Sequence, residues 1–270
     1  MTKALVKEAI APLYCDPVRG SELDDEALYG MTLEILEKGA DDFYRVRTPY
    51  RYESWCPGEY LCFDEAEVLR CETGKYMLVS SPTRDVLSQA KVQGGNLKTL
   101  TRGALIEVLD DESDWVKVRL IGGQEGFVRR AHLTRYIPAW TAGEESFRAA
   151  VTAWAKRFLG TQYRWGGRTP LGIDCSGLCS ECYRLCGVAI YRNAAIREGF
   201  PLRSIPRASI KPGDLLFFKG HVAMYLGAGK YIHSTGRAGS DGVVINSLSP
   251  ADADYREDLD TGLLDCGTIF

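Results

Sequence analysis

The sequence has no long hydrophobic run and no strong excess of charge. No apolar stretch approaches the roughly 18–20 residues that a membrane-spanning helix needs, although 45% of the 270 residues are hydrophobic. The 33 Lys and Arg nearly balance the 36 Asp and Glu, which leaves a net charge of −3. We therefore expect no binding to nucleic acid or to an anionic membrane. The composition is typical of a globular protein.

The N-terminus also lacks a recognisable secretion signal. Lys3, Lys7 and Glu8 interrupt the first ten residues, so no apolar segment follows a basic start. The chain has nine Cys, and this odd number does not suggest a disulfide framework. We expect a reducing, cytoplasmic location, although removal of a leader would leave the same sequence.

The first half of the chain predicts two small β-barrels in tandem. Short runs such as 32–36 and 43–48 are rich in β-forming residues and are separated by Gly and charged turns. The segment that begins at Asp42 is repeated from Asp114, 72 positions later. A repeat of this length indicates two copies of one small all-β unit.

The repeated pattern resembles bacterial SH3 (SH3b) domains. Each copy has an Asp-aromatic-x-x-Val segment, then an aromatic residue, and then Leu61 or Leu133. The resemblance implies one SH3b domain over residues 1–75 and a second over 76–137.

Residues 138–270 predict an α+β domain. Thr141 and Glu144 have the spacing of a capping box, and a helix with one apolar face is expected to follow and to end at Gly160. A second helix is expected after Asp174. The expected strands are 214–218, 221–226, 231–234 and 243–247, and the tail 267–270 is a candidate for the last strand. Helices followed by antiparallel strands make an α+β domain.

Cys175 is the candidate nucleophile. Asp174 stands where a helix N-cap is expected, which makes Cys175 the first helical residue. The positive end of a helix stabilises a thiolate, so we expect the pKa of this thiol to lie below its ordinary value of about 8.5. Cys179, Cys182 and Cys186 continue the helical spacing and are expected to pack in the core.

Two of the three histidines lie where a base for this thiol is needed. Within one predicted strand, His221, Ala223 and Tyr225 point to the same face. A helix packed on that face brings the Cys175 thiol to His221, which gives the nucleophile–base pair of thiol catalysis. His233, on the next strand, is the expected orienter of His221. Backbone N–H groups at the helix start provide an oxyanion hole, worth about 2.7–4 kcal/mol per donor.

Five motifs in this half of the chain resemble, in order, those of the NlpC/P60 cysteine peptidases. They are Tyr163-x-Trp165-Gly166-Gly167, Asp174-Cys175-Ser176-Gly177-Leu178, Pro212-Gly213-Asp214-Leu215, Gly220-His221-Val222-Ala223 and Tyr231-x-His233-Ser234. The resemblance covers about residues 140–270. It implies a papain-like core with Cys175 as nucleophile, His221 as base and His233 as the third polar residue.

Two SH3b domains before such a core resemble the γ-D-glutamyl-L-diamino acid endopeptidases that recycle cell-wall peptides. The resemblance implies that the first SH3b domain binds the free amino group of an N-terminal L-Ala, through Glu22 and either Tyr50 or Tyr52. A carboxylate and a phenol oxygen are suitable acceptors for an ammonium group. Ser54 and Cys56 depart from the usual Gly and Val, which leaves the choice of Tyr open.

The same resemblance implies which residues line the substrate cleft. They are Tyr163, Trp165, Asp174, Ser176 and Arg192. Arg192 is expected to clamp a substrate carboxylate.

Metal-based readings fit the residues less well. Cys175-x3-Cys179-x2-Cys182 has the spacing of the cluster ligands of radical SAM enzymes, but such ligands need an irregular loop, and this segment predicts a regular helix. Zinc bound by Cys175, His221 and His233 lacks a finger or deaminase spacing. We expect neither a metal nor a cofactor.

These observations favour a cysteine endopeptidase that cleaves the γ-D-Glu–diamino acid bond of murein tri- or tetrapeptides (L-Ala-γ-D-Glu-diamino acid) during cell-wall recycling. We expect a monomer. The sequence leaves open whether the diamino acid is meso-diaminopimelate or L-Lys. One alternative is a secreted hydrolase of intact peptidoglycan that uses its SH3b domains for targeting. Another is a non-catalytic wall-binding protein.

Overall fold

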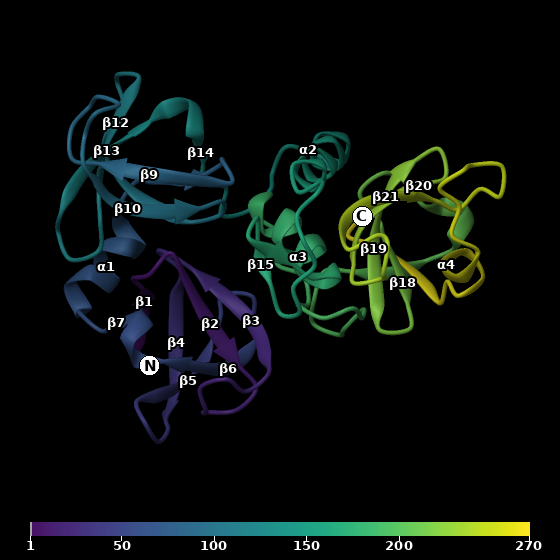
Figure 1. The fold of residues 1–270 in the computed structure, drawn as a ribbon, viewed down its shortest axis with the longest axis horizontal. Coiled ribbons are helices and arrows are strands. Elements are labelled where there is room, and N and C mark those ends of the chain that lie inside the picture. The colour runs from purple at the N-terminus through teal and green to yellow at the C-terminus, as the bar shows by residue number, and fades with distance from the viewer. Residues whose placement is uncertain (1) are drawn as a thin grey trace. The chain divides into compact units, whose positions relative to one another are not determined.

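The computed structural model describes residues 2–270. The chain divides into two compact units, Met1–Tyr136 and Ile137–Phe270, whose helices and strands are labelled in Figure 1. Among the described residues, no helix combines the length and the apolar character needed to cross a membrane.

The first unit contains two seven-stranded antiparallel sheets with the same strand order. The first sheet has the order β3-β2-β6-β5-β4-β1-β7, and the second has the order β10-β9-β13-β12-β11-β8-β14. The strands of the first sheet are β1 (Lys3–Val6), β2 (Ile10–Tyr14), β3 (Leu23–Leu28), β4 (Thr32–Lys38), β5 (Phe43–Arg47), β6 (Glu53–Pro57) and β7 (Leu61–Cys62). Those of the second are β8 (Tyr76–Val79), β9 (Thr83–Leu87), β10 (Asn96–Thr101), β11 (Leu105–Asp110), β12 (Trp115–Arg119), β13 (Glu125–Arg129) and β14 (Leu133–Arg135). The repeat in the sequence is therefore a repeat of whole sheets, with β12 beginning 72 positions after β5.

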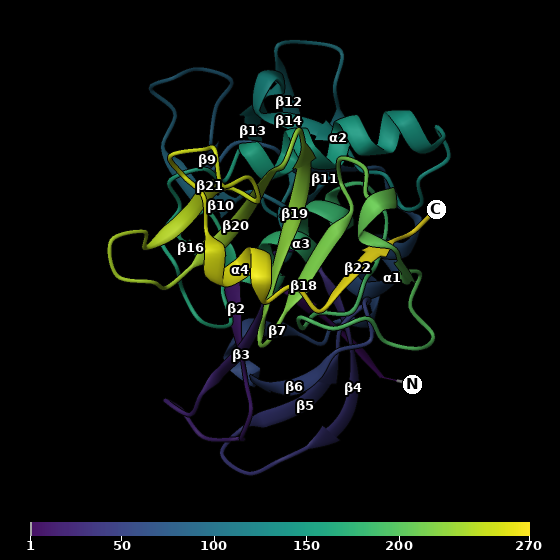
Figure 2. The ribbon, with the colours of Figure 1, turned by 90° about the vertical axis from the view of Figure 1, so that its right-hand side faces the viewer.

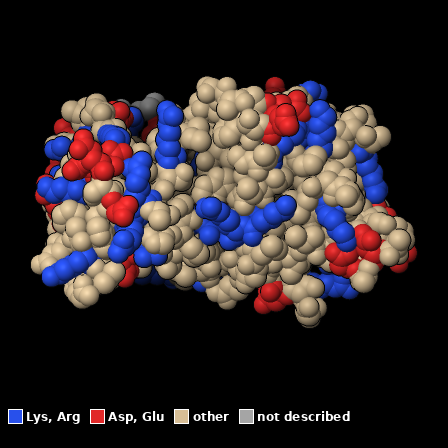
Figure 3. All heavy atoms as spheres, turned by 90° about the horizontal axis from the view of Figure 1, so that it is seen from above, with Lys and Arg blue, Asp and Glu red and all other residues tan. Residues whose placement is uncertain are grey.

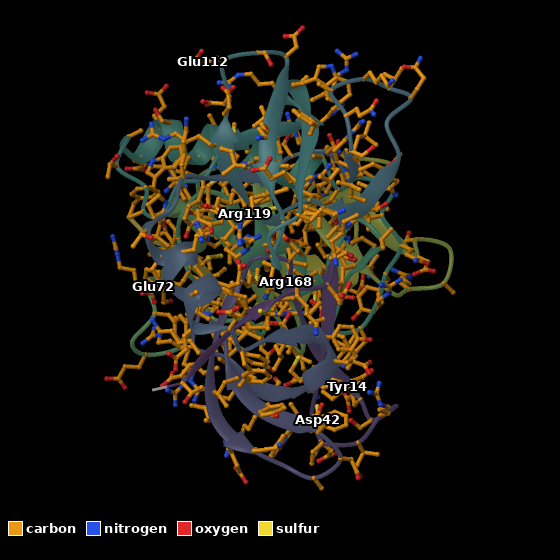
Figure 4. The ribbon with its side chains drawn as sticks, turned by 90° about the vertical axis from the view of Figure 1, so that its left-hand side faces the viewer. Tyr14, Asp42, Glu72, Glu112, Arg119 and Arg168 are labelled. Carbon is orange, nitrogen blue, oxygen red and sulfur yellow. The ribbon has the colours of Figure 1, made fainter. Side chains whose placement is uncertain are left out.

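The two sheets pack directly on one another. Tyr29, in the turn between β3 and β4, is buried in the hydrophobic core of the second sheet, and its hydroxyl accepts a hydrogen bond from the Ile121 N–H at 2.6 Å. Helix α1 (Glu65–Thr73) connects the sheets, and its Glu67 carboxylate accepts two hydrogen bonds from the Arg119 guanidinium, at 2.5 and 2.8 Å. Arg119 lies where the two sheets meet (Figure 4). The two sheets therefore share buried contacts in addition to the connecting chain.

The second unit is built on a six-stranded antiparallel sheet, the third sheet, with the order β17-β22-β18-β19-β20-β21. Its strands are β17 (Arg203–Ile205), β18 (Leu215–Phe218), β19 (His221–Gly227), β20 (Lys230–Thr235), β21 (Gly242–Ser247) and β22 (Asp265–Thr268). Its helices are α2 (Glu144–Lys156), α3 (Cys175–Leu185) and α4 (Glu257–Thr261), and β15 (Arg168–Thr169) pairs with β16 (Gly172–Ile173). Short 3-10 helices of the chain span Gly58–Tyr60, Arg130–His132 and Arg207–Ser209. The predicted α+β order of helices and strands is present in this unit.

Helices α3 and α4 cover opposite faces of the third sheet, as Figure 2 shows with α4 in front and α3 behind. Cys179 of α3 lines a small cavity together with Val222 and Phe217. Ala223 points the other way, into a core that includes Leu259 of α4. The expectation that the Cys175 helix packs on the face of Ala223 is therefore wrong, because the C-terminal segment covers that face.

Helix α2 begins differently from the sequence expectation. Its N-cap is Gly143, with φ 84° and no side-chain cap, so the capping box from Thr141 does not form. Its apolar face is the predicted one, since Phe147, Val151 and Ala155 are buried. An apolar stripe is set by contacts along the whole helix, whereas a cap depends on the conformation of a single residue.

Candidate active site

The start of α3 has the predicted arrangement. Asp174 is the N-cap, and its Oδ1 accepts hydrogen bonds from the Gly177 N–H at 2.5 Å and from Ser176 Oγ at 3.1 Å. At Gly177 a Cβ would lie 2.2 Å from the Gly167 carbonyl oxygen, so a side chain there would clash with backbone. Cys175 is the first helical residue and is 7% exposed.

Arg192 is buried beside this N-cap. Its guanidinium donates to Asp174 Oδ1 and Oδ2 at 3.0 and 2.9 Å, and to Ser176 Oγ at 2.9 Å. It is 1% exposed. A direct bond from Arg192 to a substrate carboxylate stays a prediction, whereas the contacts in the structure hold the Asp174 carboxylate in place.

The two predicted histidines lie next to each other. His221 Nε2 is 2.8 Å from His233 Nδ1, and the two rings meet edge to face with their centroids 5.0 Å apart. His233 is fully buried. Its other ring nitrogen, Nε2, lies 2.9 Å from Asn246 Oδ1. The row of side chains is therefore His221, His233 and Asn246, on three adjacent strands.

Asn246 is not among the site residues predicted from the sequence. The available signal is an amide directly after the apolar run Val243–Ile245, in the same strand β21. Such a run predicts a buried strand, and a polar residue inside it calls for a partner.

The start of α3 lies near the histidine row, at one end of β19, since Asp174 acts on the pKa of His221. The backbone N–H of Val222, the residue after His221, lies close enough to the Cys175 thiol to lower its pKa. His221 is the first residue of β19 and Cys175 is the first residue of α3. The two residues therefore lie near one another at the ends of their elements, and not across the face of the sheet as we expected.

Burial is the largest cause of the pKa shifts of Cys175, His221 and His233. It raises the pKa of the Cys175 thiol to about 11, and the neighbouring Asp174 carboxylate acts in the same direction. The N–H groups of Val222 and Ser176 lower the thiol pKa, but by less. The expectation of a lowered thiol pKa is therefore wrong for this site, because the loss of hydration outweighs stabilisation by the helix start.

The pKa values of His221 and His233 are lowered, whereas that of the thiol is raised. Burial, followed by repulsion from His233, lowers the pKa of His221 to about 3. Burial lowers the pKa of His233 to about 4. At neutral pH both imidazoles are neutral, and the thiol carries its proton. A nucleophilic sulfur at this site therefore requires proton transfer to a neutral base as it attacks.

Two further predicted cleft residues lie on the segment before α3. Burial, then the proximity of Cys175 and Asp174, raises the pKa of Tyr163 to about 12, so its hydroxyl is protonated near the thiol. Trp165 is 60% exposed. Tyr163 is thus an available hydrogen-bond donor, and Trp165 is an available apolar surface.

The residues predicted to bind an amine lie in the first unit, among additional carboxylates. Glu22 is exposed. The Tyr50 hydroxyl donates to Asp25 Oδ2 at 2.5 Å, and the Tyr52 hydroxyl donates to Asp24 Oδ1 at 2.7 Å. Asp24 and Asp25, on β3, were not predicted from the sequence, because two adjacent acidic residues at the start of a strand have no distinctive spacing. Both tyrosines remain candidates.

Two observations bear on metal chemistry. Cys175, Cys179 and Cys182 lie on a regular helix and are buried. Within residues 2–270, no group of three or more His, Cys, Asp or Glu is arranged to hold a metal ion.

Comparison with known proteins identifies the family. Residues 160–255 match the sequence profile of the NlpC/P60 family, and residues 85–134 match that of the bacterial SH3 domain. The chain is 40% identical over 271 residues to dipeptidyl-peptidase 6 of Lysinibacillus sphaericus, an alignment that covers 99% of both chains. The chain belongs to the NlpC/P60 family. It is a peptidase of the cysteine class, and its second sheet is a bacterial SH3 domain.

Two other relatives extend this NlpC/P60 assignment. The γ-D-glutamyl-L-lysine dipeptidyl-peptidase of Bacillus cereus is 27% identical over 237 residues, which cover 79% of this chain and 68% of that one. The crystal structure of an NlpC/P60 family protein from Bacillus cereus has a TM-score of 0.79 at 22% identity and covers 98% of each chain. The latter establishes likeness of fold along the whole chain.

Proposed function

We propose that this NlpC/P60 peptidase is a cytoplasmic enzyme of cell-wall recycling. It hydrolyses the γ-D-Glu–diamino acid bond of murein peptides that carry a free N-terminal L-Ala. The observation that carries the proposal is the hydrogen-bonded pair His221 and His233 beside the start of α3, where Cys175 is the first helical residue. The name of the 40% identical relative supports removal of a dipeptide.

The reaction begins with a proton transfer from sulfur to nitrogen. His221 Nδ1 takes the Cys175 proton while Sγ attacks the γ-carbonyl carbon of D-Glu. The carbonyl oxygen becomes an oxyanion, which accepts hydrogen bonds from N–H groups at the start of α3 and from the Tyr163 hydroxyl. The resting state suits this order, because neither the thiol nor the two imidazoles carries a charge before the attack.

Bond cleavage returns the proton. The tetrahedral intermediate collapses, the C–N bond breaks, and the His221 Nδ1–H protonates the leaving amine of the diamino acid. The L-Ala-γ-D-Glu acyl group remains on Cys175 as a thioester. A water molecule then gives a proton to His221 and attacks the thioester, which frees the dipeptide and restores the thiol.

We further propose that the first sheet is a second SH3b domain and that it binds the substrate amine. The domain scheme is 1–75, 76–137 and 138–270. The strand order shared with the matched SH3 domain supports the first point. The carboxylates and phenol oxygens around Glu22, Tyr50 and Tyr52 support the second, since an ammonium group is best held by such acceptors.

Replacement of Cys175 tests the proposed chemistry. The Cys175→Ala protein is expected to be folded and to release no diamino acid from L-Ala-γ-D-Glu-diamino acid, as followed by mass spectrometry. Cys62→Ala, at a partly buried cysteine of β7, is the matched control and should keep full activity. Tripeptides ending in meso-diaminopimelate and in L-Lys, assayed side by side, identify the preferred diamino acid. Hydrolysis by the Cys175→Ala protein would exclude the proposed nucleophile.

The bacterial SH3 match favours one alternative function, hydrolysis of intact cell wall by a secreted enzyme. The substrate's amino terminus separates the two functions. Acetylation of the L-Ala amine should abolish cleavage by a recycling enzyme and leave cleavage by a wall hydrolase unaffected. Activity on polymeric peptidoglycan that exceeds activity on the free tripeptide would favour the alternative.

A further inference from the structure

Asn246 occupies a fixed place behind the two histidines. On β21 it lies opposite Tyr231, while His233 lies opposite Val244, so these side chains share one face of the third sheet. Asn246 Oδ1 is 2.9 Å from His233 Nε2. On its other side, Asn246 Nδ2 donates to the Asp254 carbonyl oxygen at 2.9 Å.

The Asp254 carbonyl determines which way the Asn246 amide points. A backbone carbonyl has no proton to donate, so it must meet the NH2 of the amide and not its oxygen. This carbonyl is itself held in place, because it accepts the Ser247 N–H at 3.1 Å. The Asp254 side chain is fixed as well, through an ion pair with Lys230 at 2.6 Å. The oxygen of Asn246 is therefore the atom that faces the imidazole.

An acceptor at this position selects one of two possible proton arrangements in the histidine row. In the first, His233 Nε2–H donates to Asn246, His233 Nδ1 accepts from His221 Nε2–H, and His221 Nδ1 carries only a lone pair. In the second, His233 Nδ1–H donates to His221 Nε2, and His221 carries its proton on Nδ1. Only the first leaves a nitrogen that can take the thiol proton.

We propose that Asn246 is a positioning residue that sets the tautomer of both His233 and His221, and so keeps His221 Nδ1 free of a proton. Its effect on rate rests on the proposed peptidase function, whereas its effect on the tautomers does not. The depressed pKa values support the need for such a device, because two neutral imidazoles have no charge to determine which nitrogen carries the proton.

Nitrogen-15 NMR of the full chain with labelled histidine reads the tautomers directly. For the wild-type protein we expect His221 and His233 each to have a protonated Nε2 and an unprotonated Nδ1. A wild-type spectrum with the proton on Nδ1 of either histidine would overturn the proposal. This measurement requires no variant and no activity.

Two substitutions then separate positioning from a structural role. Asn246→Leu removes the acceptor at similar size, and Asn246→Asp keeps an acceptor at the same place. Ile245→Val, on the opposite face of β21, is the matched control. We expect Asn246→Leu to mix the tautomers and to lower kcat by roughly 100-fold with little change in KM. Asn246→Asp should keep the Nε2–H form of His233 and recover kcat to within about tenfold of wild type.

The outcomes of these experiments separate a positioning role of Asn246 from a structural one, and the inference from the proposed function. Unchanged tautomers and unchanged kcat in Asn246→Leu would contradict the proposal. Equal losses of kcat in the Leu and Asp variants, with wild-type tautomers in both, would show a merely structural role and contradict it too. Mixed tautomers in Asn246→Leu, from a wild-type protein that does not cleave the tripeptide, would confirm the inference and reject the proposed function.

Discussion

The Cys175 thiol is buried and the His221 imidazole is partly buried, and this loss of hydration determines their charge. The hydration lost by an ionised form in such a site exceeds what two backbone N–H groups return. The thiol and the imidazole are therefore both neutral at rest, and the base is ready without first losing a proton. This state differs from a preformed thiolate–imidazolium pair.

The neutral state predicts an unusual pH dependence. The competent form, a protonated thiol with a neutral His221, persists at all pH values well above the His221 and His233 pKa values of about 3 and 4. The charged groups around His221 act in both directions, since Arg256 lowers its pKa while Asp174 and Asp258 raise it. We expect kcat/KM for the tripeptide to be nearly flat from pH 8 to about pH 5.5. An acid limb centred near 6.5, in protein shown by circular dichroism to be folded, would contradict this assignment.

Arg192 predicts a stability effect at the residue scale. Asp174 is 7% exposed and takes two hydrogen bonds from this guanidinium. Arg192→Met leaves a buried carboxylate without its cation, which should lower the free energy of unfolding by about 3–5 kcal/mol. Urea unfolding measures this loss. Arg197→Met, at an exposed arginine bonded to the Tyr191 hydroxyl, is the control and should lose less than about 1 kcal/mol. Equal losses in the two variants would argue against a special role for Arg192.

At the scale of elements, the sequence predicted strands better than it predicted packing. The 72-residue repeat and the strand β19 follow from local alternation and turn residues, so both could be predicted from this sequence alone. The face that receives α3 could not be predicted in this way. Every residue of Leu215–Phe218 is buried, so β18 offers two apolar faces, and alternation does not say which one a helix covers.

The features of the candidate site also fall into two groups, those with a local signal in the sequence and those without one. Cys175 was predictable because a helix N-cap is a local signal, and so was the pairing of two scarce histidines on neighbouring strands. Asn246 and the raised thiol pKa could not be predicted from the sequence, since both depend on segments that only the fold brings together. The carbonyl that orients Asn246 lies eight residues further along the chain, in a loop.

The contact between the first and second sheets gives a prediction about elements. Tyr29 is 2% exposed within the core of the neighbouring sheet. Tyr29→Ala should lower the stability of the first unit by about 3–5 kcal/mol through the cavity it leaves. Tyr29→Phe keeps the ring and loses only the bond to the Ile121 N–H, for about 1–3 kcal/mol. Denaturant unfolding followed by fluorescence compares the two. Indistinguishable stabilities of wild type and Tyr29→Ala would mean that the two sheets do not stabilise one another.

At the scale of the whole molecule, much of the charge is distributed in pairs. In Figure 3, acidic and basic side chains lie next to one another in several places, and one band of basic side chains has no acidic side chain beside it. Ion pairs such as Lys230 with Asp252 and Asp254 hold part of the acidic C-terminal segment against the third sheet. Over the whole chain the 33 Lys and Arg nearly balance the 36 Asp and Glu, which leaves a net charge of −3.

The buried histidines also predict how stability depends on pH. Unfolded histidines take up protons near pH 6.5, whereas folded His221 and His233 resist protonation down to about 3 and 4. Below pH 6.5 the unfolded state therefore binds more protons, and stability falls as the pH falls; above pH 6.5 these groups make no difference. Between pH 6.5 and 5 we expect a loss of at most about 2 kcal/mol per histidine.

Urea unfolding at pH 7.5 and at pH 5 measures this loss. His221→Asn should reduce the difference between the two pH values, because one of the two groups no longer titrates. An equal pH dependence in wild type and variant would show that His221 is not buried as a neutral group.

The most direct test of the central claim is to capture the covalent intermediate. Wild-type protein is mixed with L-Ala-γ-D-Glu-diamino acid, the reaction is quenched in acid during turnover, and intact-mass measurement and peptide mapping locate any acyl group. We predict an L-Ala-γ-D-Glu group on Cys175 and on none of the other eight cysteines. An acyl group on another residue, or turnover without any acyl-enzyme under conditions that preserve a thioester, would contradict the account.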